Sequence, residues 1–279
     1  MKQAVTKKGT LPLVGEFSSD NRDKMKTIFL SDVHLKGPEY PGHARLIHFF
    51  DRLRGRGGSS GKEIAAGTLT LDHLVIAGDL FDFWFGRGDT IYPGFRPVVD
   101  RMAALKQEGV RISLCEGNHD FSLADYFSRQ LGIDVYPEWA EFNHYGLRIL
   151  VSHGDTVDRG NLKYLALRGF LRGSFARRLQ QLLPLVFLWR LARLSSELSK
   201  GMSRESQDRL AELMYRFSLG KFHEGYDAVI LGHCHKPLLR EISSGDRKKT
   251  FVTLGDWLTH DSYLLFDEGR FTLQRFPSE

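Results

Sequence analysis

Five short apolar runs recur along the chain, and a patch of Asp, His or Asn residues directly follows each one. Their continuous apolar character is typical of strands buried on both faces. Helical periodicity over 44–53 and 102–107 lies between some of them, which favours an α/β fold. Two later segments, 251–254 and 263–266, predict a terminal hairpin or a sheet edge. The five runs are residues 27–30, 74–77, 112–114, 147–151 and 228–231.

The patches after these strands consist of residue types that bind metals. Because ligands bind at the carboxyl ends of strands in open α/β sheets, we expect the patches to meet at one rim. Residues two apart share a face of an extended segment, so Asp32 and His34 would point together. His233 and His235 have the same spacing, which would turn Cys234 away. The patches are Asp32-Val-His34, Gly78-Asp79, Gly117-Asn118-His119-Asp120, His153-Gly-Asp155 and Gly232-His233-Cys-His235.

Oxygen donors mixed with imidazole suit Mn²⁺, Fe²⁺, Co²⁺ or Zn²⁺ better than copper. Two such ions would lower the pKa of bound water and clamp the oxygens of an in-line phosphoryl displacement. Any single Gly-Asp or His-x-His pair is common in turns and on surfaces. Five patches in order, each directly after a strand, favour a metal site. A site that binds metal without catalysis is the alternative.

Composition narrows the class of protein. The 279 residues carry a formal net charge of +5, which favours an acidic partner such as nucleic acid or anionic lipid. Two cysteines, Cys115 and Cys234, exclude a disulfide framework and favour a reducing compartment. No apolar run approaches the roughly 20 residues of a membrane span, and the N-terminus lacks a long signal-peptide core. We therefore expect a soluble or membrane-peripheral protein.

The strand pattern gives way to helical spacing in the second half of the chain. We divide the chain into a tail (1–24), a core (25–158 and 219–279) and a helical insertion (159–218), with a Gly-rich loop at 55–61. Between residues 159 and 204 the insertion has ten basic residues among Leu and Phe, and Glu197 is its one acid. Such a segment favours an anionic membrane surface and disfavours nucleic acid. The alternative is a helical pair packed on the domain, with arginine stems along apolar surface.

The patches resemble the D-x-H, G-D, G-N-H-D, H-G-D and G-H-x-H pattern of the calcineurin-like metallophosphoesterase family, over residues 27–236. This resemblance implies a four-layer αββα sandwich with two metal ions at the strand ends and an inserted helical lid. It also implies catalytic roles for Asn118, His119 and Asp120, in which His119, held by Asp120, contacts the substrate phosphate and protonates the leaving oxygen. The implied ligands are Asp32, His34, Asp79 and His235 for one ion, and Asp79, Asn118, His153 and His233 for the other.

A closer resemblance is to the UDP-2,3-diacylglucosamine hydrolase branch of this family, over residues 27–266. It is carried by Gly78–Gly86, by lid positions such as Leu183–Leu185, and by Leu254-Gly255-Asp256-Trp257, where the branch has Leu-Gly-Ala-Trp. The resemblance implies Mn²⁺-dependent cleavage of a nucleotide-lipid pyrophosphate in lipid A biosynthesis. The products would be UMP and 2,3-diacylglucosamine 1-phosphate, formed at the cytoplasmic face of the inner membrane. The implied substrate contacts are Trp84, Tyr164, Arg168, Arg193, Ser199 and Lys200.

Two positions depart from the branch. His119 and Ser196 stand where its members have Arg, although Arg193 lies one turn before Ser196. The metal ligands are complete, so these departures leave the metal site intact and bear on the substrate and, at His119, on phosphate contact and acid chemistry. A broader phosphoesterase acting on a soluble nucleotide or phosphodiester is therefore one alternative, and a metal-binding scaffold without catalysis is a second. The sequence gives no oligomeric state.

Overall fold

A computed structural model describes residues 25–55, 68–84, 90–173, 178, 182, 204–244 and 247–277. The predicted tail, most of the Gly-rich loop and the lid positions Arg193, Ser196, Ser199 and Lys200 lie outside these ranges.

Two sheets contain most of the strands. Parallel pairing joins four neighbouring strands of the first sheet and three of the second. The first sheet has the order β13 (Arg270–Arg275), β12 (Ser262–Asp267), β1 (Thr27–Leu30), β4 (His73–Ala77), β5 (Arg111–Cys115) and β6 (Asp134–Tyr136). The second has the order β10 (Pro237–Ser244), β11 (Arg247–Leu254), β9 (Ala228–Leu231), β8 (Leu147–Ser152) and β7 (Trp139–His144).

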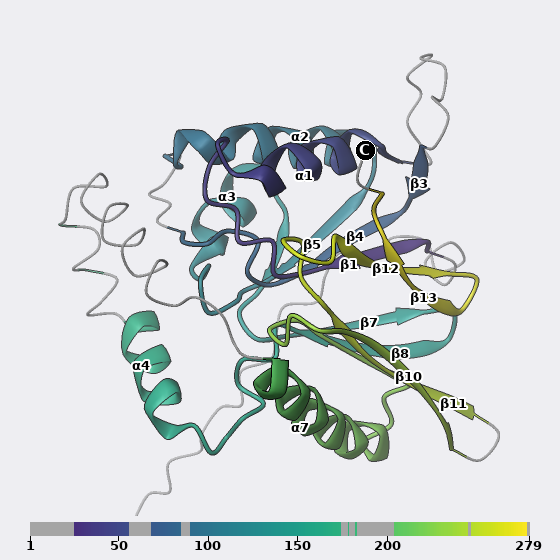
Figure 1. Cartoon of the computed structure of the whole chain (residues 1–279). Coiled ribbons are helices and arrows are strands. Elements are labelled where there is room, and N and C mark those ends of the chain that lie inside the picture. Colours follow the sequence, from purple (N-terminus) through teal and green to yellow (C-terminus); the bar gives the residue numbers. More distant parts are fainter. Residues whose placement is uncertain are drawn as a thin grey trace, which may run out of the picture.

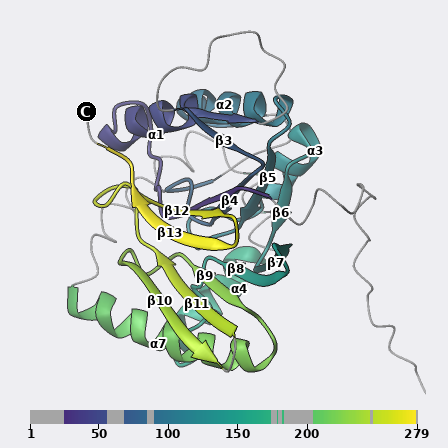
Figure 2. The same cartoon turned by 90° about the vertical axis from the view of Figure 1, so that its right-hand side faces the viewer.

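Helices cover the outer faces of both sheets. The first sheet lies under α1 (Pro41–Asp51), α2 (Arg96–Gln107) and the short α3 (Phe127–Leu131), and α7 (Arg204–His223) lies on the second (Figures 1 and 2). A small pair of strands, β2 (Leu53–Gly55) and β3 (Leu69–Leu71), extends beside α2. The order is helix, sheet, sheet, helix, so the predicted α/β sandwich is confirmed.

The four layers explain why strands such as β1 and β9 are apolar on both faces. In β1, Ile28 and Leu30 pack in the cluster beneath α1 and α2, whereas Phe29 packs between the two sheets. In β9, Ile230 packs between the sheets, whereas Val229 and Leu231 pack on the side of α7. A strand buried on both faces has no polar side, and polar residues therefore begin where the strand ends.

The structure differs from the sequence predictions at two places. Strands β11 and β12 do not form a hairpin, because β11 pairs with β10 and β9 while β12 pairs with β1 and β13. Neither strand lies at a sheet edge. Helix α7 runs through the predicted lid boundary at residue 218, and its Ala211 and Met214 are buried against the second sheet. We therefore assign α7 to the core and α4 (Leu162–Arg172) to the insertion.

Candidate metal centre

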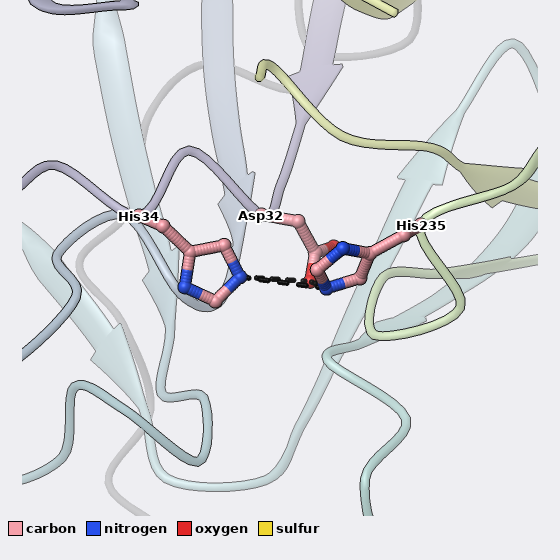
Figure 3. A group of neighbouring side chains, drawn as sticks. All are labelled: Asp32, His34 and His235. Atoms are coloured by element: carbon pink, nitrogen blue, oxygen red, sulfur yellow. Dashed lines mark hydrogen bonds and ion pairs between the residues drawn. The ribbon is translucent and has the colours of Figure 1, made fainter. Parts of the chain in front are cut away.

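The strand-end patches meet at one rim, where both sheets contribute. His235 Nε2 lies 3.2 Å from Asp32 Oδ1 and 3.4 Å from His34 Nε2 (Figure 3). Asp79 Oδ2 lies 3.8 Å from His34 Nε2 and 3.3 Å from His153 Nε2. Asp79 is thus placed between two groups of donors, as a bridging carboxylate requires.

The remaining predicted ligands complete the second group. Asn118 Oδ1 lies 2.9 Å from His153 Nε2, and the ring of His233 stands edge-on to His153 with centroids 5.0 Å apart. Among the described residues, three sets of donors have all their ligand atoms within 4.8 Å of one another, and they suit a divalent metal. These sets are Asp32, His34 and His235; His34, Asp79 and His119; and Asp32, Asp79 and His153.

The outer contacts of the histidines also fit a metal. A metal-binding histidine donates its other ring N–H to a carboxylate or a carbonyl oxygen. His153 Nδ1 is 3.1 Å from the carbonyl oxygen of Ala77, and His34 Nδ1 is 3.5 Å from Asp82 Oδ1. On the other side of the rim, Asp256 Oδ2 lies 3.7 Å from the Nδ1 atom of His235. The Nε2 atoms of all three rings consequently point toward the centre.

The electrostatics of the rim favour cations. Burial raises the pKa of Asp32, but the hydrogen bond and charge of His235 outweigh burial and lower it to about 2. Burial lowers the pKa of His153, but Asp79 and other carboxylates raise it to about 10. Asp32 is therefore ionised at neutral pH, and a proton on His153 occupies the position that a metal would take. Metal binding must displace such protons, since a histidine ligand is neutral.

Glycines in three patches make room for ligands from other strands. A Cβ atom on Gly78 would lie 2.7 Å from the ring of His153, and one on Gly232 would lie 2.8 Å from Asp32 Oδ2. A Cβ atom on Gly117 would lie only 2.0 Å from Asp79 Oδ1. Each of these glycines therefore allows a ligand from a different patch to approach the backbone closely.

The ligands that are two residues apart have left-handed backbone conformations. The extended conformation predicted for these two segments is therefore wrong. The φ angles are 54° at Asp32, 48° at His34, 62° at His233 and 56° at His235. Cys234 is buried, and its Sγ atom lies 3.3 Å from the Gln207 carbonyl oxygen on α7. The residue between each pair of ligands thus anchors the turn in a core, while left-handed residues on both sides direct the ligands to the rim. Asp79 has a φ of 51° as well.

Asp120 and His119 have different partners from those expected. The buried carboxylate of Asp120 accepts hydrogen bonds from the backbone N–H groups of Asp79, Phe81 and Gly117, at 3.0, 3.1 and 3.0 Å. It joins the second and third patches rather than holding the His119 ring. The ring atom His119 Nδ1 instead lies 3.0 Å from the Asp82 carbonyl oxygen. The backbone N–H of His119 donates to Asp79 Oδ1 at 2.9 Å.

The predicted substrate contacts that the structure describes separate into two groups. Trp84 is buried and packs on Phe81 and Phe127, which places its ring in the core beneath the helices. Tyr164 and Arg168 lie on α4 and reach the rim. The Tyr164 hydroxyl donates to Asp155 Oδ2 at 2.6 Å, and Arg168 Nε donates to the same oxygen at 2.8 Å. Arg193, Ser199 and Lys200 lie outside the described residues.

Helix α4 presents its apolar side to solvent. Its polar residues Tyr164, Arg168 and Arg172 recur every four positions and contact the core. On the other side, Leu162 is 72% exposed and Phe170 is 56% exposed. This orientation is the reverse of an ordinary surface helix, which buries its apolar stripe. Within the described ranges, no helix is long and apolar enough to cross a membrane.

Sequence reasoning missed several residues that shape the rim. Asp256 and Asp82 face ligand histidines, and Glu116 with Arg172 joins α4 to the loop that contains Asn118. The only sequence signal for Asp256 was its departure from the Leu-Gly-Ala-Trp pattern. Glu116 and Arg172 are 56 positions apart, and no spacing rule connects them.

Comparison with known proteins defines the class. Residues 25–237 match the Calcineurin-like phosphoesterase family, and the chain therefore belongs to this family of metal-dependent hydrolases. Among its relatives is the UDP-2,3-diacylglucosamine hydrolase of Vibrio cholerae serotype O1 (strain ATCC 39315 / El Tor Inaba N16961). The two are 30% identical over 255 residues, which cover 88% of this chain and 96% of that protein.

A protein of the same name from Stenotrophomonas maltophilia (strain K279a) is 30% identical over 269 residues, covering 91% of this chain and 100% of that protein. Another, from Photorhabdus laumondii, is 28% identical over 255 residues, covering 91% and 100% of the two chains. Both resemblances stated from the sequence are thus confirmed.

Proposed function

We propose that this protein hydrolyses the pyrophosphate of UDP-2,3-diacylglucosamine, using two divalent metal ions, with Mn²⁺ as the expected ion. The products are UMP and 2,3-diacylglucosamine 1-phosphate, which places the reaction in lipid A biosynthesis. The names of the relatives in Vibrio cholerae and Stenotrophomonas maltophilia support the substrate. The observation that carries the proposal is the position of α4, whose polar side contacts the metal rim while its apolar side is exposed.

The rim residues have two roles in the proposed reaction, metal binding and proton donation. The two ions, when bound, supply an activated water and neutralise phosphate charge. Asp32, His34, Asp79 and His235 would hold one ion, and Asp79, Asn118, His153 and His233 the other. The backbone carbonyl of Asp82 accepts from His119 Nδ1, which fixes that nitrogen as a donor. In its protonated form, His119 presents Nε2–H to a phosphate oxygen and can give this proton to the leaving group.

The apolar side of α4 supports a lipid substrate and a membrane surface. Leu162, Leu167 and Phe170 are each more than half exposed, which is unusual for a helix whose only role is packing. We assign this surface to the acyl chains of the substrate and to the adjacent bilayer. The net charge of +5 supports peripheral binding to anionic lipid, at the cytoplasmic face of the inner membrane.

The proposal is tested with purified full-length protein, Mn²⁺ and UDP-2,3-diacylglucosamine in mixed micelles, by measuring UMP release. A soluble phosphodiester serves as the competing substrate. Mn²⁺-dependent release of UMP at a higher kcat/KM than diester cleavage is the expected result. Turnover of the soluble diester without UMP release would replace this function with the broader phosphoesterase. Inactivity on both substrates despite bound metal would favour a non-catalytic scaffold.

A matched pair of variants tests the role of α4. The double variant L167S/F170S removes two exposed apolar side chains from α4, whereas Leu219→Ser removes one from α7, where Leu219 is 36% exposed. We expect L167S/F170S to lower kcat/KM for the lipid at least tenfold and to weaken sedimentation with vesicles containing phosphatidylglycerol. Diester turnover should be unchanged in both variants. Equal losses on lipid and diester would return α4 to a purely structural role.

A further inference from the structure

The loop that contains Asn118 and His119 is closed by one buried carboxylate. Glu116 precedes the loop at the end of β5 and is only 6% exposed. Its Oε1 atom accepts a hydrogen bond from the backbone N–H of Leu123 at 2.9 Å, seven residues further along. This bond joins the two ends of the loop, so Glu116 restricts where Asn118 and His119 can lie.

The same carboxylate binds helix α4. Arg172, at the C-terminal end of α4, donates from Nη1 to Glu116 Oε2 at 2.9 Å. Its Nη2 atom donates to the carbonyl oxygen of Gly117 at 2.7 Å, directly before Asn118 in the chain. Nη1 also donates to the Pro137 carbonyl oxygen at 3.1 Å. The Arg172 guanidinium group thus binds both the Glu116 side chain and the Gly117 backbone at the start of the loop.

Because the Glu116–Arg172 ion pair is buried, the loss of either partner should destabilise the other. The side chains of Arg172 and Glu116 are 16% and 7% exposed. Bonds between two ionised groups are stronger than neutral ones, and a buried charge that loses its partner is strongly destabilised. Without Arg172, the Glu116 carboxylate would turn toward water, and Leu123 would lose its acceptor. The loop would then hold Asn118 and His119 less firmly.

We propose that Glu116 and Arg172 are positioning residues that fix the Asn118–His119 loop to α4, and that they thereby couple metal binding at the rim to the orientation of α4. The inference rests on the proposed two-metal centre. Coupling of this kind is reciprocal, since a ligand that stabilises the loop must stabilise its contact with α4 by the same free energy. Metal should therefore order α4, and loss of the α4 contact should weaken metal binding.

The test is a titration of the metal-free full-length protein with Mn²⁺, using Arg172→Ala and the control Lys163→Ala. Lys163 is an exposed cation on the same helix, so the control removes one charge from α4 and leaves the pair intact. We expect Arg172→Ala to raise the Mn²⁺ Kd about tenfold or more, in the range typical of residues that orient metal ligands. Arg172→Lys should recover part of the loss, and Lys163→Ala should bind as the wild type does.

Hydrogen exchange gives a second readout that a purely structural role would not change. In the wild type, Mn²⁺ should slow amide exchange over 164–172, and Arg172→Ala should abolish this effect. Glu116→Gln keeps an acceptor for Leu123, and it tests the ion pair if Arg172→Ala does not fold. Mn²⁺ affinities within twofold of the wild type in Arg172→Ala and Glu116→Gln would overturn the inference. Failure of the wild type to bind Mn²⁺ would instead overturn the metal centre of the proposed function.

Discussion

Replacing Gly117 by Ala tests whether the rim depends on close contact between patches. Gly117 has no side chain because the Asp79 carboxylate occupies the space where a Cβ atom would stand. An added Cβ atom would lie 2.0 Å from Asp79 Oδ1 and 2.5 Å from the Asp79 backbone nitrogen. Neither neighbour is the free end of a long side chain, so the Asp79 carboxylate or the Asn118 loop must move.

The size of the effect follows from the distance. A Cβ atom essentially never lies closer than 3.0 Å to another heavy atom of this kind. Because the added Cβ atom would start 2.0 Å from Asp79 Oδ1, the two atoms must move apart by roughly one ångström. A displacement of about 1 Å at a reacting centre can cost about 10²-fold in rate. Because Asp79 lies between both donor groups, we expect Gly117→Ala to lower kcat about 100-fold and to weaken Mn²⁺ binding.

The assay compares Gly117→Ala with Gly220→Ala, since both substitutions add one methyl group. Gly220 lies in α7, and a Cβ atom there would have no heavy atom within 4 Å. Gly220→Ala should retain full activity and gain about 1 kcal/mol in the free energy of unfolding, because Ala is the better helix former. Mn²⁺ titration, UMP release and thermal unfolding are measured on both. A Gly117→Ala protein with more than a tenth of wild-type kcat would refute the reasoning.

Three further variants test other parts of the structure. Asp79→Ala should abolish activity, because it removes the carboxylate between both donor groups; more than a tenth of the wild-type rate would contradict the bridging role. Asp256→Asn keeps the oxygen that accepts from Thr259 but removes the charge that faces His235, and it should raise the Mn²⁺ Kd about tenfold in a titration. His73 is fully buried, and burial holds its pKa well below 6.5, so unfolded chains bind a proton that the folded state does not. The contribution of His73 to stability should therefore fall below about pH 6.5, by at most about 1.4 kcal/mol per pH unit, and urea unfolding should show a smaller loss for His73→Asn than for the wild type.

The sequence predicted which strand-end residues meet at the rim, and it did so for a physical reason. Strands buried on both faces must be apolar, and the change to Asp, His and Asn therefore marks where each strand leaves the core. The strand-end positions of Asp32, Asp79 and His153 follow directly from this change. All seven predicted ligands gather at the rim, although their binding of metal stays a prediction until it is measured.

Pairing between distant segments could not be predicted in the same way. Strand β12 pairs with β1 from the other end of the chain, and its apolar run gave no sign that it lies in a different sheet from β11. The apolar spacing of α7 also gave no sign of whether it covers a sheet or belongs to the insertion. Trp84 lies in a motif that implied substrate contact, whereas its burial depends on aromatic neighbours from several elements.

The left-handed backbone at the rim limits which metals the protein can be made to accept. Among residues with a side chain, Asp, Asn and His adopt positive φ several-fold more readily than average. At Asp32, His34, Asp79, His233 and His235, a change of donor is therefore also a change of backbone strain. Converting these positions to cysteine, to obtain a soft thiolate site, would lose this tolerance as well as the original donor. The turn geometry itself thus selects for oxygen and imidazole, and a redesign toward copper(I) would have to rebuild the turns first.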